Sequence, residues 1–407
     1  MKKLSLLTIG FFGILLTACS QKEVEFQLIN NSASDLIGKS IVIDRSELEL
    51  KYGKLPEQPY AVLVDEADHK FVAQLDDLDG DGAWDELFSQ VDIKAGETKS
   101  FDIDFNDREL LAAIPVKTNI RFADINDASK EYTTAERLKS NTTEISQKYF
   151  QFEGPGWEND VVAFRNYFDA RNGIDIFGKT TANMALDQCG LKGGPVYHEL
   201  QPWGMDILKV ANSLGAGAIA LQTPSGLYRV GPDCHGTYTL VKEGSLRSIF
   251  DLGFEGIQID GKTIQVKHQI SIEAGKPYYN SRVWVDGDDE AKLVTGIVNL
   301  HSDSVYSKVN EDISYFYTYD NQAFDGEKLG LAIIVPTNVL TVQAAPEEGE
   351  GITQTFYTAL PITEQPVEFY FMAGWEKQDA VYSTKAGFEK AIAKQAKEIA
   401  AQVDVRI

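Results

Sequence analysis

The residues best equipped for chemistry are concentrated between Trp157 and Lys209. If residues 161–171 form a strand, their side chains alternate between two faces. The apolar face then holds Val162, Phe164, Phe168 and Ala170. The polar face holds Arg165, Tyr167, Asp169 and Arg171. Guanidinium groups match carboxylates in two-point geometry, so the polar face suits an anionic ligand rich in hydroxyls, such as an acidic sugar. An edge strand with ordinary surface ion pairs is the alternative.

Two of the five histidines lie beside other groups that can transfer protons. His198 follows Tyr197 and precedes the segment 203–206, while His235 lies in the irregular segment 231–238. Histidines near tyrosines and carboxylates suit proton transfer at neutral pH. A zinc site built from both histidines and an aspartate stays open, although no metal-ligand spacing supports it.

An acidic loop at 77–86 has the oxygen spacing of a calcium site. Its carboxylates stand at positions one, three, five and nine, with a glycine at position six, and they belong to Asp77, Asp79, Asp81 and Asp85. Alternate oxygens converge on one point where a chain turns sharply, as calcium requires. We predict a structural calcium ion here and no organic cofactor, with an acidic hairpin turn as the alternative.

The charge of the chain limits its partners. The 38 basic and 61 acidic residues give a formal net charge of −23, which repels nucleic acid. An anionic substrate must therefore be captured by local basic residues. The sequence contains no nucleophile elbow, phosphate loop or dinucleotide fingerprint.

The first residues form a lipoprotein signal. Met-Lys-Lys precedes an apolar run from Leu4 to Leu16, and small residues then precede Cys19. We expect residues 1–18 to be removed and Cys19 to be acylated, so that the lipid is the only membrane anchor of a periplasm-facing or surface outer-membrane lipoprotein. An ordinary cleaved signal is the alternative. Cys189 and Cys234 would then form a disulfide or remain two buried thiols.

Strand patterns separated by glycine turns recur along the chain and predict an all-β fold. We expect an N-terminal β-sandwich domain at 19–143, which includes the acidic loop, and a larger catalytic domain at 144–407. The polar segment from about Asp127 to Thr143 is expected to connect them. A C-terminal helix is predicted from an apolar stripe that needs a sheet to pack on and consists of Phe388, Ile392, Ile399 and Val403.

Three groups of motifs carry a family resemblance. They are Asp-Gly-Asp-Gly-x-Trp-Asp-Glu-Leu at 79–87, Phe-Arg-Asn-Tyr-Phe-Asp-Ala-Arg-Asn-Gly-Ile-Asp-Ile-Phe-Gly-Lys at 164–179, and Tyr-His-Glu with Trp-Gly-Met-Asp-Ile-Leu-Lys within 197–209. On these motifs nearly the whole mature chain resembles a family of Bacteroidota lipoproteins labelled as a domain of unknown function. The resemblance implies a place among polysaccharide-utilisation genes for uronate-containing glycans such as pectin or ulvan. It also implies an oligosaccharide dehydratase, which removes water from a non-reducing-end uronic acid and leaves a 4,5-unsaturated residue. By analogy the larger domain would be a β-supersandwich, as in mutarotase-like proteins and many polysaccharide lyases.

Such an elimination needs a neutralised carboxylate, a base for the C5 proton and an acid for the departing 4-hydroxyl. Arg165 and Arg171 can hold the carboxylate, and Tyr197 and His198 can be base and acid in either order. His235 is a fifth candidate catalytic residue. The candidate substrate-binding residues are Tyr167, Asn172, Lys179, Trp203, Asp206 and Tyr238.

Two other functions stay open. One is a non-catalytic surface glycan-binding lipoprotein, which would stack sugars on aromatic strand faces. The tyrosines on the best such face are Tyr315, Tyr317 and Tyr319, which core packing would also explain. The other is a mutarotase or epimerase on the same fold.

Overall fold

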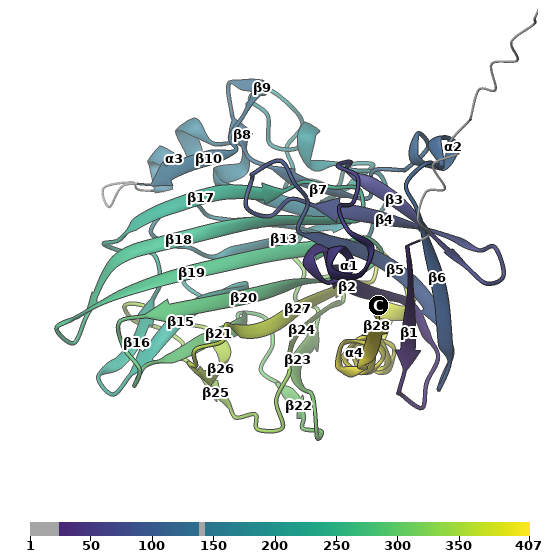
Figure 1. Cartoon of the computed structure of the whole chain (residues 1–407). Helices are drawn as coiled ribbons and strands as arrows, with labels where there is room; N and C mark the ends of the chain where they lie inside the picture. The colour runs from purple at the N-terminus through teal and green to yellow at the C-terminus, as the bar shows by residue number, and fades with distance from the viewer. Residues whose placement is uncertain (1–23, 138–142) are drawn as a thin grey trace, which may run out of the picture.

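Antiparallel strands dominate the computed structural model, which describes residues 24–137 and 143–407 (Figure 1). Apolar and polar side chains alternate along them, so that in β19 (Lys262–Glu273) Ile264, Val266 and Ile270 are buried while Gln265 and Lys267 are exposed. The predicted all-β fold is confirmed. The signal sequence and Cys19 lie outside the described residues. Within the described ranges, no helix combines the length and the apolar character needed to cross a membrane.

The first part of the chain forms a seven-stranded sheet. In spatial order its strands are β2 (Leu36–Asp44), β5 (Glu86–Ile93), β4 (Lys70–Asp76), β3 (Tyr60–Asp65), β6 (Thr98–Asp104), β1 (Glu25–Asn30) and β28 (Val403–Arg406). A core that includes Phe26, Leu63 and Phe101 covers one face. The short helices of this region are α1 (Arg45–Tyr52) and α2 (Arg108–Leu111). Because β28 pairs with β1, the end of the chain completes the first sheet.

A nine-stranded sheet forms the largest layer of the rest of the chain. Its strands are β10 (Thr134–Arg137), β17 (His235–Lys242), β18 (Arg247–Ile259), β19, β20 (Tyr278–Asp286), β27 (Val367–Trp375), β24 (Leu329–Val335), β23 (Ser314–Asp320) and β22 (Tyr306–Lys308). The long strands β17 to β20 cross the front of the molecule in Figure 1.

Two five-stranded sheets share a core with the nine-stranded sheet. The first contains β14 (Gly204–Asp206), β13 (Ile174–Lys179), β12 (Ala163–Asn166), β11 (Gly156–Asn159) and β7 (Thr118–Arg121). The second contains β16 (Gly226–Arg229), β15 (Ala216–Thr223), β21 (Lys292–Val298), β26 (Thr355–Pro361) and β25 (Val342–Ala344). Other short elements are β8 (Ala123–Asp124), α3 (Thr143–Tyr149) and the 3₁₀ turns η1 (Gln151–Glu153), η2 (Leu186–Gln188) and η3 (Ala380–Ser383). The shared core is aromatic, and Trp157 packs 5.2 Å from Phe250 and 5.3 Å from Tyr279.

The segment 127–143 was expected to be a connection, and this prediction is wrong for its described part. It contains β9 (Asp127–Glu131), which pairs with β8, and β10, which pairs with β17 of the nine-stranded sheet. β10 is an edge strand whose side chains are mostly not buried, so its sequence shows no apolar alternation. Only the pairing with β17 reveals it.

The predicted C-terminal helix is confirmed as α4 (Lys385–Ala400), which lies between β23 and the first sheet in Figure 1. The prediction is wrong for Val403, which lies beyond the helix at the start of β28 and pairs with Asn30. Phe388 contacts the rings of Tyr317 and Tyr319 at 6.1 and 6.0 Å. Tyr315 and Tyr317 are buried under the helix. They are core residues and cannot stack sugars, because α4 covers the strand face that was considered for that role.

Arg247 fastens the first sheet to the nine-stranded sheet. Its Nε lies 3.0 Å from Asp76 at the end of β4, and its Nη2 lies 2.8 Å from Glu86 at the start of β5. The backbone of Arg247 is held as well, since Gln74 Nε2 donates to its carbonyl at 2.7 Å. One side chain of β18 therefore holds both ends of the acidic loop.

We predict that Arg247→Ala destabilises the protein by about 3–5 kcal/mol, because the buried carboxylate of Asp76 loses its guanidinium partner. The measurement is the midpoint of urea unfolding. Arg108→Ala, which removes an exposed arginine of α2, is the control. Equal midpoints for the two variants would show that Arg247 does not join the sheets energetically.

Candidate active site

The polar residues predicted on one strand face lie instead at a strand end and on the turn that follows it. β12 ends at Asn166 and lies between β11 and β13. The chain then reverses, with Tyr167 N donating to Gly173 O at 2.9 Å. Asn172 has a φ of 38°, which asparagine tolerates better than most residues. Arg171 therefore projects from a turn.

The centre of the site is the buried guanidinium of Arg165, whose side chain is 3% exposed. Its Nη2 lies 2.7 Å from Asp175 Oδ2 and 3.0 Å from Asp206 Oδ2. Nε also donates to Asp175, and Nη1 donates to Phe152 O and to the hydroxyl of Tyr197. All five N–H groups are engaged within the protein. Arg165 therefore cannot hold a substrate carboxylate as the sequence predicted, and it positions other groups instead.

Asp175 is a member of the cluster that sequence reasoning missed. The hydroxyl of Tyr167 donates to its Oδ2 at 2.7 Å. Burial and the neighbouring Asp206 raise the pKa of Asp175 to about 6, although Arg165 opposes the change. Two carboxylates that face one guanidinium leave surplus negative charge in the interior.

His198 forms the exposed edge of the cluster. Asp206 N donates to Tyr197 O at 2.8 Å, which places the next residue beside the Asp206 side chain. His198 Nδ1 lies 3.3 Å from Asp206 Oδ2, and the side chain is 48% exposed. The hydrogen bond with Asp206 raises the pKa of His198 despite its partial burial. Its Nε2 has no hydrogen-bond partner among the described residues and is free to meet a ligand.

Tyr197 lies between His198 and Arg165. The rings of Tyr197 and His198 are 4.3 Å apart, and the Tyr197 hydroxyl accepts a hydrogen bond from Arg165 Nη1 at 3.1 Å. Burial raises the pKa of Tyr197, while Arg165 partly opposes this. The phenol therefore keeps its proton at neutral pH.

Arg171 retains hydrogen-bonding capacity for a ligand. Its guanidinium stacks 3.9 Å from the centre of the Tyr167 ring. Nε and Nη2 donate to Asp169, and Nη2 also pairs with Glu153. Nη1 has no partner among the described residues, and the side chain is 32% exposed. Of the two predicted carboxylate-binding arginines, only Arg171 can contact a substrate.

Glu153 is a second residue that sequence reasoning missed. Besides pairing with Arg171, its Oε1 lies 3.7 Å from Arg165 Nη1. Phe152 and Glu153 have φ values of 37° and 74°. Such residues cost of order 1–3 kcal/mol each and cluster at functional sites. No residue pattern signals this turn, whose Phe152 O accepts a hydrogen bond from Arg165 Nη1.

A family model described as a domain of unknown function (DUF4861) matches residues 28–405. The chain belongs to the DUF4861 family. It is 24% identical over 413 residues to Uncharacterized protein P7 of Formosa agariphila, a match that covers 97% of this chain and 96% of that protein.

Two solved structures resemble this DUF4861 protein. An alpha-mannosidase from Enterococcus faecalis V583 is 7% identical with a TM-score of 0.46, over 94% of this chain and 46% of that one. A protein in the Glycosyl Hydrolase Family 38 from Enterococcus faecalis is 7% identical with a TM-score of 0.48, over 96% and 48%. The chain thus spans about half the length of the solved structures that it matches.

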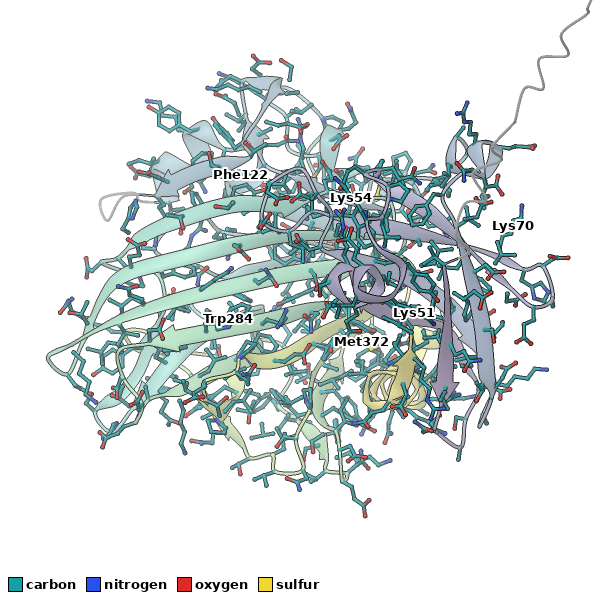
Figure 2. The ribbon with its side chains drawn as sticks, viewed as in Figure 1. Lys51, Lys54, Lys70, Phe122, Trp284 and Met372 are labelled. Carbon is teal, nitrogen blue, oxygen red and sulfur yellow. The ribbon has the colours of Figure 1, made fainter. Side chains whose placement is uncertain are left out.

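In the DUF4861 protein, two predicted substrate-binding residues lie in the interior. Lys179 Nζ lies 2.6 Å from Glu158 Oε2 and 2.6 Å from Asn159 O, and its side chain is 1% exposed. Tyr238 packs 4.9 Å from the ring of Phe122, which is labelled in Figure 2. Neither side chain can contact a substrate, because protein atoms enclose both. The prediction is wrong for Lys179 and Tyr238.

Asn172 and His235 are also displaced from their predicted roles. Asn172 is buried and accepts a hydrogen bond from Asn166 Nδ2 at 2.8 Å, so it holds the turn. His235, at the start of β17, lies 3.5 Å from Glu136 and 3.8 Å from Glu255 and has no contact with the Arg165 cluster. Within the described residues, no group of three metal ligands includes a histidine, which leaves the zinc alternative without support.

Two aromatic residues border the exposed edge. The predicted Trp203 is partly buried, 6.0 Å from Phe177. Phe324 is 53% exposed, lies 6.3 Å from the His198 ring, and is fixed by a 2.8 Å hydrogen bond from its N to Ile207 O. Sequence reasoning missed Phe324, because it comes from the loop between β23 and β24.

Cys189 and Cys234 are two buried thiols that no disulfide joins, which confirms the alternative to a disulfide. They pack in separate clusters, Cys234 in the main core and Cys189 beside Phe152 and Phe177.

The acidic loop joins β4 to β5, and three of its four predicted ligands converge. Carboxylate oxygens of Asp77, Asp79 and Asp85 lie within 4.8 Å of one another. Asp81 is outside this group and accepts a hydrogen bond from Ala83 N at 2.7 Å. The convergence also suits an acidic turn, because Asp77 accepts hydrogen bonds from backbone N–H groups of the loop. Calcium binding stays a prediction.

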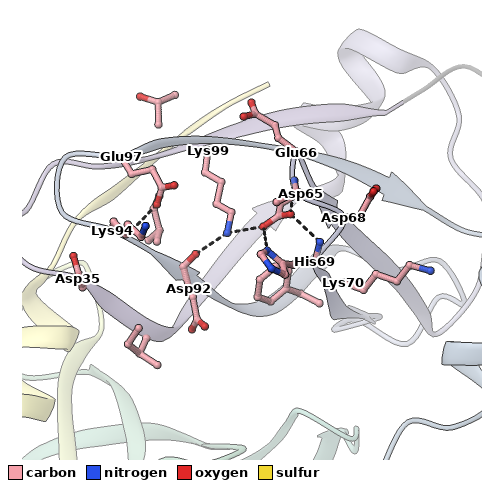
Figure 3. A pocket seen from close by; sticks show the side chains of 15 residues that line it. Asp35, Asp65, Glu66, Asp68, His69, Lys70, Asp92, Lys94, Glu97 and Lys99 are labelled. Atoms are coloured by element: carbon pink, nitrogen blue, oxygen red, sulfur yellow. Dashed lines mark hydrogen bonds and ion pairs between the residues drawn. The ribbon is translucent and has the colours of Figure 1, made fainter.

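A separate cleft of about 920 Å³ lies on the first sheet, away from the predicted site residues (Figure 3). Asp65 is its central group, with Lys99 Nζ at 2.7 Å and His69 Nδ1 at 3.0 Å. Although burial raises the pKa of Asp65, hydrogen bonds from Lys99 and His69 hold it below its usual range. This paired network holds the β3–β4 turn, since Asp65 also accepts hydrogen bonds from Ala67 N and His69 N.

We predict that calcium stabilises the protein through the acidic loop. Calcium at a hundredfold excess over its Kd contributes about 2.7 kcal/mol if it binds only the native state. The measurement is the melting temperature with calcium and with chelator. Asp79→Asn should abolish the difference, whereas Asp303→Asn, an exposed control, should retain it. If the wild-type melting temperature is the same with calcium and with chelator, the loop is an acidic turn.

Proposed function

We propose that this protein is a hydro-lyase that dehydrates the non-reducing-end uronic acid of an acidic oligosaccharide of the ulvan or pectin type. The supporting observation is the grouping of the half-exposed His198, the Tyr197 hydroxyl and the free N–H groups of Arg171 around one buried cluster. They offer a base, an acid and a carboxylate-binding group, the three that this elimination needs.

In the proposed reaction, His198 Nε2 removes the C5 proton, and the electrons of the C5–H bond form the C4=C5 double bond. The C4–O bond breaks, and the departing hydroxyl takes the proton of Tyr197 and leaves as water. The proton on His198 then returns to Tyr197 through solvent. One saturated uronyl residue gives one unsaturated residue and one water. Arg171 stabilises the charge that develops on the carboxylate.

The surroundings of the two groups favour this order of base and acid. Burial raises the pKa of Tyr197, so the phenol has a proton to give. Asp206 raises the pKa of His198, which makes the neutral imidazole a stronger base. Asp206 also orients the ring with Nε2 outward, since Nδ1 faces the carboxylate.

The test is an incubation with oligosaccharides that end in a saturated uronic acid, followed by ultraviolet absorbance of the conjugated product. His198→Ala and Tyr197→Phe should each lower the rate about 10²- to 10⁴-fold. Arg171→Ala should lower it about 10²- to 10³-fold. The melting temperatures of His198→Ala and Tyr197→Phe should equal that of the wild type. Arg108→Ala is the matched control for Arg171→Ala.

Three results would contradict the proposal. Binding without any new absorbance would identify the glycan-binding alternative. A change of optical rotation without absorbance would identify an epimerase or mutarotase. Normal rates in all three variants would place the site elsewhere.

The pH dependence tests the assignment of the base. Because His198 acts in its neutral form, kcat/KM should rise with pH through a pKa above the ordinary value for histidine. Asp206→Asn removes the carboxylate that stabilises the imidazolium, so this rise should move to lower pH while the maximum rate falls. Asp303→Asn should leave the profile in place. A rate that instead falls as pH rises through the histidine pKa would assign His198 as the acid.

We also propose that the protein is a lipoprotein anchored through Cys19. Support comes from the basic start, the apolar run and the small residues before that cysteine. An acyl anchor at residue 19 would hold the domains at the membrane surface, where imported or surface-bound oligosaccharides are available.

A further inference from the structure

We propose that Arg229 is the second arginine of the carboxylate-binding site and acts together with Arg171 on the uronate. This inference rests on the proposed function. It adds a residue that neither the charged motif nor the elimination chemistry indicated.

The position of Arg229 is fixed against the turn that carries Arg171. Arg229 is the last residue of β16, in the second five-stranded sheet. Its Nη1 donates to Arg171 O at 2.8 Å, and its Nη2 donates to Asn212 O at 2.7 Å and Ser213 O at 3.1 Å. The two arginines therefore meet where two sheets adjoin, although 58 positions separate them in the sequence.

Arg229 is a partly buried cation without an acidic partner. No carboxylate of the described residues forms an ion pair with it, and its three hydrogen bonds all go to backbone carbonyls. Among the other arginines of low exposure, carboxylates pair with Arg45, Arg121, Arg165, Arg171 and Arg247, whereas Arg137 in the core donates to Gly231 O and Cys234 Sγ. Burial and the like charge of Arg171 lower the pKa of Arg229 to about 10, although the charge of Asp169 opposes this change. An anion bound beside both guanidiniums would relieve this unfavourable arrangement.

Each of the two arginines has N–H groups to offer such an anion. Arg171 Nη1 and Arg229 Nε lack hydrogen-bond partners among the described residues, and neither is among the polar atoms buried without a partner. Both therefore reach solvent. Guanidinium groups favour carboxylates because paired N–H donors match the two oxygens. Arg165 cannot take part, since its donors are used inside the cluster.

Backbone strain borders both arginines. Asn172, directly after Arg171, has a φ of 38°, and Ala211, directly before Asn212, has a φ of 49°. Positive φ is unfavourable for alanine, so the fold bears a cost to keep these two turns in place. These turns present Arg171 and supply one of the carbonyls that fix Arg229.

The arrangement predicts discrimination by charge. A uronate carboxylate would accept hydrogen bonds from Arg171 Nη1 and Arg229 Nε, whereas a neutral sugar of the same shape would bring no negative charge to Arg229, which has no ion-pair partner among the described residues. In a chain with a net charge of −23, this local pair supplies attraction that the general field does not.

The test measures binding by calorimetry for two probes, an oligosaccharide that ends in glucuronic acid and its counterpart that ends in glucose. Arg229→Gln should weaken binding of the acidic probe about 10- to 100-fold and leave the neutral probe unchanged. Arg229→Lys, which keeps a positive charge, should recover part of the loss. Arg108→Gln is the matched control and should bind both probes as the wild type does.

Several results would overturn the inference. They are an unchanged affinity of Arg229→Gln for the acidic probe, an equal loss for both probes, and a wild type that binds the two probes alike. If Arg229→Gln does not fold, a partial or complete loss of selectivity in Arg229→Lys decides for the pair, and full retention decides against it. Selective binding that depends on Arg229 without any absorbance product would leave this inference standing and refute the dehydratase. Normal turnover by Arg229→Gln with an unchanged KM would refute this inference and leave the dehydratase standing.

Discussion

The candidate site depends on one buried guanidinium. Arg165 joins β13 through Asp175, β14 through Asp206 and the η1 turn through Phe152 O. Without its charge, the two carboxylates would repel each other in the interior. Their repulsion would release β14, and with it the segment that carries the exposed imidazole. Arg165 therefore contacts only groups of the protein, and through these contacts it fixes the positions of groups that solvent can reach.

Much of the fold could be predicted from the sequence, because its determinants are local. Strand patterns separated by glycine turns predicted the all-β fold, and the apolar stripe predicted α4. The edge strand β10 was missed because exposed edges need no alternation. The return of β28 to the first sheet was missed because nothing in Val403–Arg406 indicates its partner.

The sequence predicted several residues of the site but not how they are arranged. Tyr197, His198 and Asp206 do lie together, because one short segment carries them. A charged residue in a motif, however, does not reveal whether a buried partner already satisfies it. Lys179 forms a buried ion pair with Glu158, and only the tertiary structure shows this pair. Arg229 lacks such a partner, and no local pattern distinguishes these two cases.

The pairing of β1 with β28 has a consequence for how the protein forms. These strands lie at opposite ends of the described chain, so the first sheet cannot be completed until residues 403–406 have been synthesised. Until then β1 is an open edge with unpaired backbone groups, which favours association with other chains. Contacts between such distant residues also form slowly. The chain therefore exposes this edge of β1 until its last strand is in place.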